Sequence, residues 1–395
     1  MALKKISHHV TRPGRHLGES EVTIPVAEDL VTLPGVPLRE QDLTSYDREY
    51  PLESVSLTDS AAFDFMRPRR KYFSEGTENQ SDFYDEYMKP YVKWVKDSGE
   101  MVPTGTPTGE DATDKIRQKA RELGAVEVGF TAMDDRHIYA SKKKEVRQDL
   151  PHAICLAIEQ DYEMTKMTPS VATMWTHDDC YERQALIAQE MVAFIHDLGY
   201  STQVNGPAIS YGPMIPLFVS AGLGQVGANG ILMSPHFGPW ARLQVIMTDA
   251  KVTYTPPIDY GIHAFCQICQ TCTNRCPGRA LAREKVWYRG AHKNKLSMRR
   301  CIPMLARYEA CGVCMKTCPI GVYGMKPVMD HYVETGEVLG KGTHDLEGYT
   351  LPNKGYFGPG ELPRFDAETF ALPKGRSEDW MLLEFRDQLR EAKVD

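Results

Sequence analysis

The sequence predicts a mixed α/β fold: an α/β sandwich followed by a cysteine-rich segment. Helical and strand-like patterns alternate between residues 111 and 255, which is typical of packed α/β layers. Eight of the ten cysteines then fall between Cys266 and Cys318. We expect an extended N-terminal segment that wraps the body (1–110), the α/β domain (111–255), the cysteine-rich domain (256–330) and a C-terminal extension with a terminal helix (331–395).

The α/β domain is expected to begin with a helix over 111–124, in which Ile116, Ala120 and Leu123 share one face and Gly124 ends the pattern. Short apolar runs follow, bounded by polar residues, and such runs predict buried strands. The runs are AVEVGF (125–130), AICLAIE (153–159) and RLQVIMTD (242–249).

The clearest helix is expected over 181–199, and shorter helices are expected near 82–95 and 378–392. Asp178 or Asp179 is the expected N-cap of the long helix, because a carboxylate there can accept from free backbone N–H groups. The helix has one apolar stripe, formed by Leu186, Ile187, Met191, Phe194, Ile195 and Leu198.

The first cysteine group, FCQICQTCTNRCP, has the spacing C-x2-C-x2-C-x3-C and ends in proline. In two-cluster ferredoxins such a run supplies three ligands of one [4Fe–4S] cluster and lends its fourth cysteine to another. The second group, Cys311-x2-Cys314-x3-Cys318, lacks one cysteine, which Cys301 can supply. Exchange of the fourth ligands predicts two sets: Cys266, Cys269, Cys272 and Cys318 in one, and Cys276, Cys301, Cys311 and Cys314 in the other.

Zinc is the alternative metal for these cysteines, because C-x2-C pairs also suit zinc sites. Two runs that both end in Cys-Pro favour iron–sulfur clusters instead. Cys155 and Cys180 are left over from the two sets, and we expect them to be core thiols.

Charge and hydropathy exclude some classes of protein. The formal net charge of −7 disfavours a nucleic-acid-binding protein. The first 30 residues lack the apolar core of a signal peptide, and no apolar run is long enough to predict a membrane span. Metal-binding cysteines need reduced thiols, so we expect a cytoplasmic protein; an exported form whose signal was removed is the alternative.

A glycine-rich run, SAGLGQVGANGILMSPHFGPWARL (220–243), precedes the cysteines. Its GLGQVG matches the GxGxxG of dinucleotide-binding folds only weakly, because it follows a proline-broken stretch and lacks an acidic partner at the usual distance. Glycines at this density predict a backbone that closely approaches something large and flat.

This run, followed by FCQICQTCTNRCP and RRCIPMLARYEACGVCMKTCP, resembles the cobalamin-dependent reductive dehalogenases over about residues 111–325. The epoxyqueuosine reductases share the same order of blocks. The resemblance implies a nitroreductase-like corrinoid-binding domain followed by a two-cluster ferredoxin-like domain. It also implies cobalamin and two [4Fe–4S] clusters, a small organohalide substrate, and an external electron donor such as a ferredoxin, a flavodoxin or a reductase.

The resemblance places a proton-donating tyrosine at Tyr181 and an assisting basic residue at Arg242. Free tyrosine is a weak acid, with a pKa of about 10. A position in the first turn of a helix and a nearby guanidinium would both favour the phenolate, so we expect Tyr181 to act as the general acid. Helix-start packing and a surface ion pair are the respective alternative roles. Asp179 is the runner-up acid, since the epoxyqueuosine reductases use an aspartate in this region.

Several residues of the glycine-rich run are expected to contact the corrinoid, although a turn role is the alternative for Ser234 and His236. Three aromatic residues, Trp175, Tyr211 and Trp240, are expected either to line an apolar substrate pocket or to pack in the core. The expected corrinoid contacts are Gly222, Leu223, Gly224, Gln225, Ser234, His236 and Gly238.

Reductive dehalogenation of a small organohalide is the function that the sequence favours. One alternative is an epoxyqueuosine-reductase-like enzyme acting on tRNA, which the acidic composition disfavours because phosphate contacts need basic residues. The other is an iron–sulfur electron-transfer subunit, in which residues 111–255 would have no assigned function.

Overall fold

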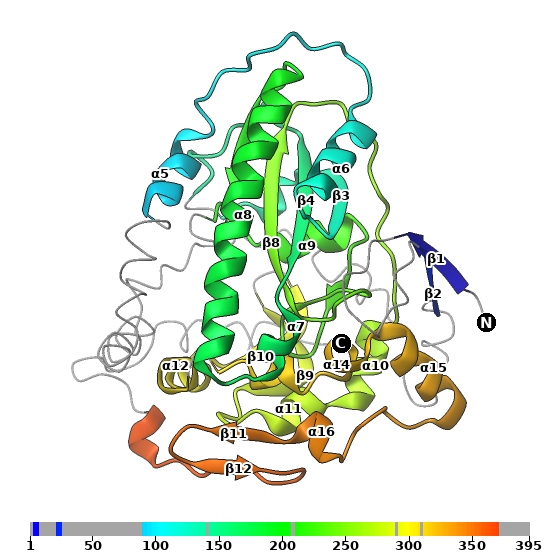
Figure 1. The fold of residues 1–395 in the computed structure, drawn as a ribbon, viewed down its shortest axis with the longest axis vertical. Helices are drawn as coiled ribbons and strands as arrows, with labels where there is room; N and C mark the ends of the chain where they lie inside the picture. The colour runs from blue at the N-terminus through cyan, green and yellow to red at the C-terminus, as the bar shows by residue number, and fades with distance from the viewer. Residues whose placement is uncertain are drawn as a thin grey trace.

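The computed structural model describes residues 3–7, 21–25, 89–139, 142–206, 210–288, 291–308 and 311–370. They form a mixed α/β fold, as predicted, around a four-stranded antiparallel sheet with the order β3-β4-β8-β5 (Figure 1). The strands are Glu127–Ala132 (β3), His152–Glu159 (β4), Ala241–Thr248 (β8) and Thr202–Asn205 (β5). The apolar runs therefore identified β3, β4 and β8, whereas the short and polar β5 was not predicted.

Helices cover both faces of the sheet. The long helix α8 (Val171–Asp197) and α6 (Thr113–Glu122) lie on one face, and α9 (Met214–Ser220) packs on the other (Figure 1). Because side chains alternate along a strand, β4 contributes side chains to both cores, and its sequence is one continuous apolar run. Ile154, Leu156 and Ile158 enter the core beneath α8, and Ala153, Cys155 and Ala157 enter the core beneath α9.

The start of α8 differs from the prediction. The helix begins at Val171, and the Ser170 hydroxyl caps it by accepting from the backbone N–H of Thr173 at 3.3 Å. The expected cap at Asp178 or Asp179 is therefore wrong. Polar residues in the first turns concealed the buried positions there, and Leu186, expected in the apolar stripe, is exposed.

Shorter elements complete the first part of the chain. Residues before 89 that belong to the helix expected near 82–95 lie outside the described residues. None of the described helices is both long and apolar enough to cross a bilayer. The further elements are β1 (Leu3–Ser7), β2 (Glu21–Pro25), α5 (Lys89–Asp97), η3 (Asp135–His137), α7 (Tyr162–Lys166), β6 (Gln225–Val226) and β7 (Leu232–Met233).

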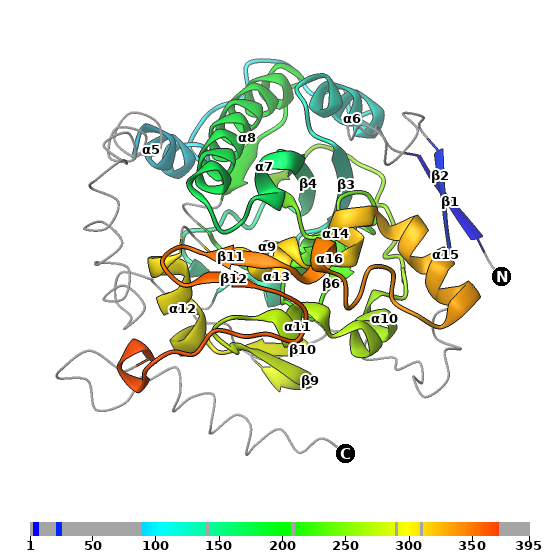
Figure 2. The ribbon, with the colours of Figure 1, turned by 60° about the horizontal axis from the view of Figure 1, so that its bottom comes forward.

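The cysteine-rich part consists of short helices, as expected, with a β9–β10 hairpin that was not predicted (Figure 2). The terminal helix expected near 378–392 lies outside the described residues. The elements are α10 (Ile262–Cys269), α11 (Thr271–Arg275), β9 (Leu281–Tyr288), β10 (Ala291–Leu296), α12 (Met298–Arg307), α13 (Val313–Lys316), α14 (Pro319–Tyr323), α15 (Met325–Thr335), α16 (His344–Glu347), β11 (Tyr349–Leu351), β12 (Gly355–Phe357) and η5 (Ala367–Phe370).

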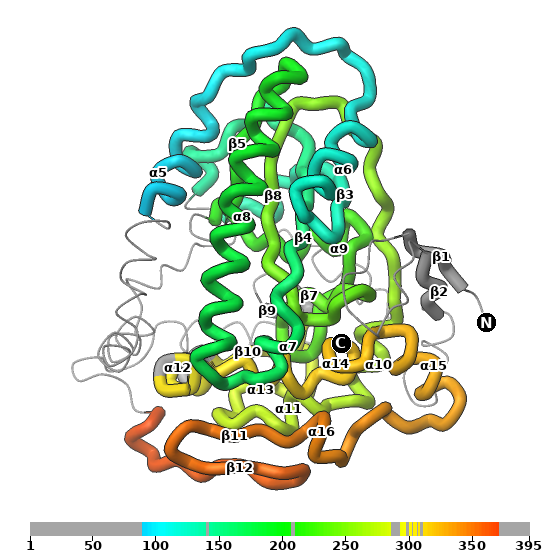
Figure 3. Tube along the Cα trace, viewed as in Figure 1, coloured from blue at the N-terminus to red at the C-terminus, as the bar shows by residue number. Residues whose placement is uncertain are grey.

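The two parts meet where β4 ends and β8 begins. The Trp240 indole donates to the carbonyl of Met315 at 2.9 Å, and the Tyr162 hydroxyl donates to the carbonyl of Val322 at 3.0 Å. The two rings also pack on each other, with their centroids 4.8 Å apart. The trace in Figure 3 shows the N-terminal end of α8 at the level of α13, so the long helix leads from the cysteine-rich part to the far end of the sheet.

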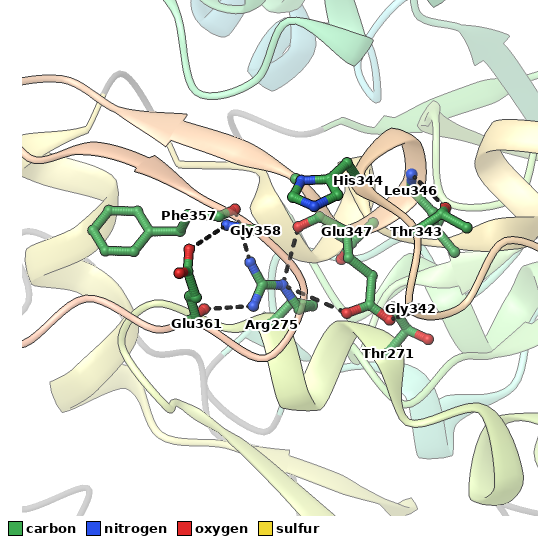
Figure 4. Close-up of polar contacts among 12 residues, drawn as sticks. Thr271, Arg275, Gly342, Thr343, His344, Leu346, Glu347, Phe357, Gly358 and Glu361 are labelled. Carbon is green, nitrogen blue, oxygen red and sulfur yellow. Dashed lines mark hydrogen bonds and ion pairs between the residues drawn. The ribbon is translucent and has the colours of Figure 1, made fainter.

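Arg275 anchors the C-terminal hairpin beneath the cysteine-bearing helices (Figure 4). Its guanidinium is buried and donates to the carbonyls of Glu347 at 3.0 Å, Phe357 at 3.1 Å and Glu361. It also lies over the Tyr349 ring, 4.8 Å from the centroid. One side chain, three residues after Cys272, thus donates to three backbone carbonyls of the C-terminal segment.

Replacing Arg275 with methionine is expected to lower the free energy of unfolding by about 2–4 kcal/mol, because three carbonyls lose a donor and the buried Glu347 carboxylate loses its cationic partner. Urea denaturation followed by circular dichroism measures this change. Arg283→Met is the matched control, since Arg283 is exposed and donates only to the Asn274 side chain at 2.8 Å among the contacts described. Equal stability of the two variants would show that the Arg275 contacts do not hold the hairpin.

Candidate functional site

Four cysteines line one cavity in the cysteine-rich part. Cys266 and Cys269 lie one turn apart on α10, Cys272 lies on α11, and Cys318 directly precedes α14. All four line the same cavity, together with Ala228 and Met233 from the glycine-rich run and Pro319 and Ile320 from the start of α14. Cys318 therefore joins the first cysteine run although it is distant in sequence.

The electrostatics of these thiols suit a cationic cluster. Burial, followed by the proximity of Cys269, raises the pKa of Cys266 to about 12. Burial and the neighbouring thiols of Cys266, Cys269 and Cys318 raise the pKa of Cys272 well above its usual value. Three buried thiolates and one half-buried thiolate would repel one another strongly, so they need a compensating positive charge, which the irons of a cluster would supply.

The second predicted set is also brought together. Burial, followed by the proximity of Cys276, raises the pKa of Cys301 to about 12, and burial, Cys301 and Cys276 together raise that of Cys311. The pKa of Cys314 is raised by burial and by the proximity of Cys301, Cys311 and Cys276. Cys272 lies on α11 and Cys314 on α13, and these two helices are in contact, so the two sets are neighbours. Within the described ranges, no three His, Cys, Asp or Glu side chains surround a point where one ion would fit.

The two remaining cysteines lie in the sheet-and-helix cores. Cys155 is buried in β4 beneath α9, and burial raises its pKa. Cys180 is buried in α8 and donates weakly to the carbonyl of Ile158, with the sulfur 3.7 Å from the oxygen. Both have the character of the core thiols that the sequence indicated.

Tyr181 and Arg242 are in contact. The Arg242 guanidinium, at the start of β8, lies over the Tyr181 ring with its Cζ 4.8 Å from the ring centroid. Both side chains are half-buried, and Arg242 Nε is buried without a hydrogen-bond partner among the described residues. The half-buried phenol of Tyr181 thus lies beside a guanidinium whose Nε–H makes no hydrogen bond within the described residues.

The position of Tyr181 within α8 corrects the electrostatic reasoning from sequence. Because the helix begins at Val171, Tyr181 lies in its interior rather than in the first turn. The macrodipole acts mainly within a terminal turn, so it does not assist this residue. The runner-up acid, Asp179, is exposed and forms an ion pair with Arg183 across one helical turn at 2.9 Å. Of the two acids considered, Tyr181 is the one that contacts the basic residue.

The glycines expected at the corrinoid are packed against the chain itself. Gly222 and Gly224 have positive φ angles of 72° and 155°, and a Cβ would lie 2.4 Å from the carbonyl oxygen of Pro256 and 2.5 Å from that of Met233, respectively. A Cβ on Gly238 would lie 2.7 Å from the backbone nitrogen of Gly321, just after Cys318. These close approaches require glycine without any ligand.

Polar side chains of the same run also have partners within the chain. The Gln225 amide accepts from the backbone N–H of Tyr260 at 2.8 Å and donates to Asp259 at 3.0 Å, which fixes the entry to α10. Leu223 alone among the seven expected corrinoid contacts is half-buried; the other six are buried. The run therefore joins the sheet to the cysteine-bearing helices.

A buried acid in β3 also holds the glycine-rich run and was missed from sequence. The Ser234 hydroxyl donates to Glu127 Oε1 at 2.8 Å, and His236 Nε2 lies 3.0 Å from the same oxygen. Burial raises the pKa of Glu127 to about 8. A charged residue inside the apolar run AVEVGF was the signal that could have identified it.

The aromatic residues divide between surface and core. Tyr211 and Trp240 are buried, whereas the Trp175 side chain on α8 is 55% exposed. Trp240 packs against Met315 and Val322 of the cysteine-rich part. It therefore belongs to the junction of the two parts rather than to a pocket that the structure describes.

Comparisons with known proteins found similar sequences, although no family model matches the chain. The tetrachloroethene reductive dehalogenase of Dehalobacter restrictus is 28% identical over 219 residues, which is 45% of this chain and 39% of the relative. An epoxyqueuosine reductase of Lactococcus garvieae is 26% identical over 301 residues, covering 71% and 69%. The chain thus spans about two fifths of the length of the first of these relatives.

A solved structure shows the same fold. The catabolic reductive dehalogenase NpRdhA superposes with a TM-score of 0.55 at 26% identity, covering 63% of this chain and 39% of that one. It has also been solved with 3-bromo-4-hydroxybenzoic acid. A further similar structure, with a TM-score of 0.55 at 26% identity, is described as suggesting a mechanism for B12-dependent dehalogenation.

Proposed function

Because the chain is a homologue of the reductive dehalogenases, we propose that it replaces a carbon–halogen bond with a carbon–hydrogen bond, using cobalamin and two [4Fe–4S] clusters. One observation carries the proposal. The start of β8 places Trp240 against the cysteine-rich part and, two residues on, Arg242 against Tyr181. The proposed electron route and the proposed proton donor would thus lie at the same end of the two central strands, β4 and β8.

The reaction needs two electrons and one proton, and it releases a halide ion. The cysteine sets supply the electron route: Cys266, Cys269, Cys272 and Cys318 would hold one cluster and Cys276, Cys301, Cys311 and Cys314 the other. The two sets are neighbours, so electrons entering at one can reach the other. We propose an external donor such as a ferredoxin, a flavodoxin or a reductase as their source.

Tyr181 would provide the proton. Its hydroxyl donates to the carbon that loses the halogen, and the guanidinium over the ring stabilises the phenolate that remains. The proton is then recovered from solvent. Arg242 therefore acts on the same group in both stages, without itself exchanging a proton.

Cobalamin fits the region around Gln160 and Arg242 better than it fits the glycine-rich run. The glycine-rich run offers no open face, because its glycines and polar side chains are engaged within the chain. Among the described residues, buried polar atoms without a hydrogen-bond partner lie instead on Gln160, just after β4, and on Arg242 of β8. These are the residues proposed to hold it; when bound, its low-valent cobalt supplies the reducing equivalents for carbon–halogen cleavage.

Epoxide reduction on a tRNA base is the second candidate, favoured by the larger share of the chain that the Lactococcus garvieae relative covers. The structure gives its expected acid less support, because Asp179 is exposed and paired with Arg183. The net charge of −7 also offers little attraction for a polyanion.

Anaerobic reconstitution of the full chain with iron, sulfide and cobalamin tests the proposal. With a chemical reductant, the holoprotein is expected to release halide from one or more members of a panel of haloaromatic and haloalkene compounds. Epoxyqueuosine-containing tRNA is expected to remain unreduced under the same conditions. Reduction of the tRNA without halide release would assign the chain to the second activity.

A further inference from the structure

Gln160 has a buried amide without a hydrogen-bond partner among the described residues. The residue is 1% exposed, and neither its amide oxygen nor its amide nitrogen has a hydrogen-bond partner in the described part of the chain. Buried polar groups nearly always have partners, because an unmade hydrogen bond is costly in a low-dielectric interior. An amide with both ends unmatched is therefore a sign of a ligand that supplies the missing partners.

The place of Gln160 in the sheet puts it beside the proposed active site. Its backbone N–H donates to the carbonyl of Trp240 at 3.1 Å, which continues the register that pairs Ile158 with Arg242. Because side chains alternate along strands, Gln160 and Arg242 lie on one face as diagonal neighbours, with Cβ atoms somewhat less than about 7–8 Å apart. Ile158 packs in the α8 core, so this is the α8 face.

Gln160 is not the only unsatisfied polar group at this place among the described residues. Arg242 Nε is likewise buried without a partner in the described residues, and it belongs to the guanidinium that lies over Tyr181. On the other side of Gln160, Trp240 binds the cysteine-rich part. Gln160 thus lies between the electron route and the proton donor, where the reacting cofactor must also lie.

The chemistry of the amide selects the ligand. A glutamine side chain needs a group that both accepts and donates. A haloalkene has neither capacity, and a halophenol offers one hydroxyl to the two ends of the amide. A corrinoid carries carboxamide groups around its ring, and two carboxamides can pair through complementary hydrogen bonds. We propose that Gln160 binds a peripheral carboxamide of the corrinoid, an inference that rests on the proposed function.

Corrinoid binding to the Gln160→Met variant tests this inference without measuring turnover. The full chain with reconstituted clusters is titrated with cobalamin, and with a corrinoid whose peripheral amides are converted to methyl esters. The Kd for cobalamin is expected to rise about 10–100-fold in the variant, as for the loss of two buried hydrogen bonds. The wild type is expected to bind the ester weakly, and the variant to discriminate less between the two corrinoids.

Gln203→Met is the matched control, because Gln203 is a buried glutamine whose amide is satisfied by the Arg147 N–H at 2.9 Å and the Glu145 carbonyl at 2.9 Å. It is expected to lower the Tm of the corrinoid-free protein and leave the Kd unchanged. Gln160→Met is expected to keep or raise that Tm, because it removes an unsatisfied group.

Failure of this inference and failure of the proposed function would give different results. A lowered Tm with an unchanged Kd in Gln160→Met would show an internal role and overturn the inference, as would an unchanged Kd with a raised KM for the organohalide. Wild-type protein that binds no corrinoid would overturn both the inference and the proposed function. Wild type and variant that bind cobalamin equally would leave the function standing and remove Gln160 from it.

Discussion

Replacing Tyr181 with phenylalanine is expected to lower halide release by about 10²–10⁴-fold, the usual contribution of a general acid. The substitution removes only the hydroxyl, so the ring can still pack beneath the Arg242 guanidinium. Iron and corrinoid contents should therefore stay at wild-type levels. Steady-state halide release, measured together with both contents, separates loss of the proton donor from loss of a cofactor.

Tyr200→Phe is the matched control for this variant. Tyr200 follows the other end of α8, and its hydroxyl accepts from the backbone N–H of Gly109 at 3.2 Å. Loss of that hydrogen bond is expected to leave halide release within about twofold of the wild type, because it touches nothing in the site. Unchanged turnover in Tyr181→Phe would remove this tyrosine from the mechanism, and a loss of corrinoid would give it a binding role instead.

Replacing Cys318 with alanine is expected to remove one cluster and abolish halide release. Cys318 lines the same cavity as the first cysteine run, so its loss should release Cys266, Cys269 and Cys272. The iron content is expected to fall to about half, because the second set keeps its four ligands. Alkylation under native conditions, read by mass spectrometry, should label the released thiols and spare Cys314.

The alternative pairing gives the opposite labelling. If each cysteine run held its own cluster without exchange, Cys318→Ala would release Cys301, Cys311 and Cys314 and protect the first run. Cys155→Ala controls for general loss of stability, because Cys155 is a buried core thiol outside both sets. It is expected to retain all of the iron.

Local pattern predicted those parts of the fold in which one physical requirement dominates. β4 is buried on both faces, so its apolar run is unbroken and its bounds could be placed within one residue. The spacing of the cysteines predicted that Cys318 joins the first run, and these four thiols line one cavity although Cys318 is far from Cys272 in the chain. That the two sets hold clusters stays a prediction.

Other features depend on tertiary contacts that spacing does not record. The first turns of α8 carry polar residues because these residues bond to α7 and its cap, and this hid the start at Val171. Thr173 donates to the carbonyl of Met164 at 3.0 Å, and Thr176 accepts from the backbone N–H of Asp161 at 3.1 Å. The glycines at 222 and 224 require close approach, as predicted, but what approaches is the backbone of Pro256 and Met233. Gln160 is an ordinary residue in sequence and becomes notable only when its burial is known.

The metal content of active protein tests the central claim most directly. If the eight thiols hold two clusters beside a corrinoid, anaerobically purified protein that releases halide should contain about eight irons and one cobalt per chain. Halide release should then rise in proportion to cobalt at constant iron. Cobalt-free protein with full iron content that still releases halide would contradict the account.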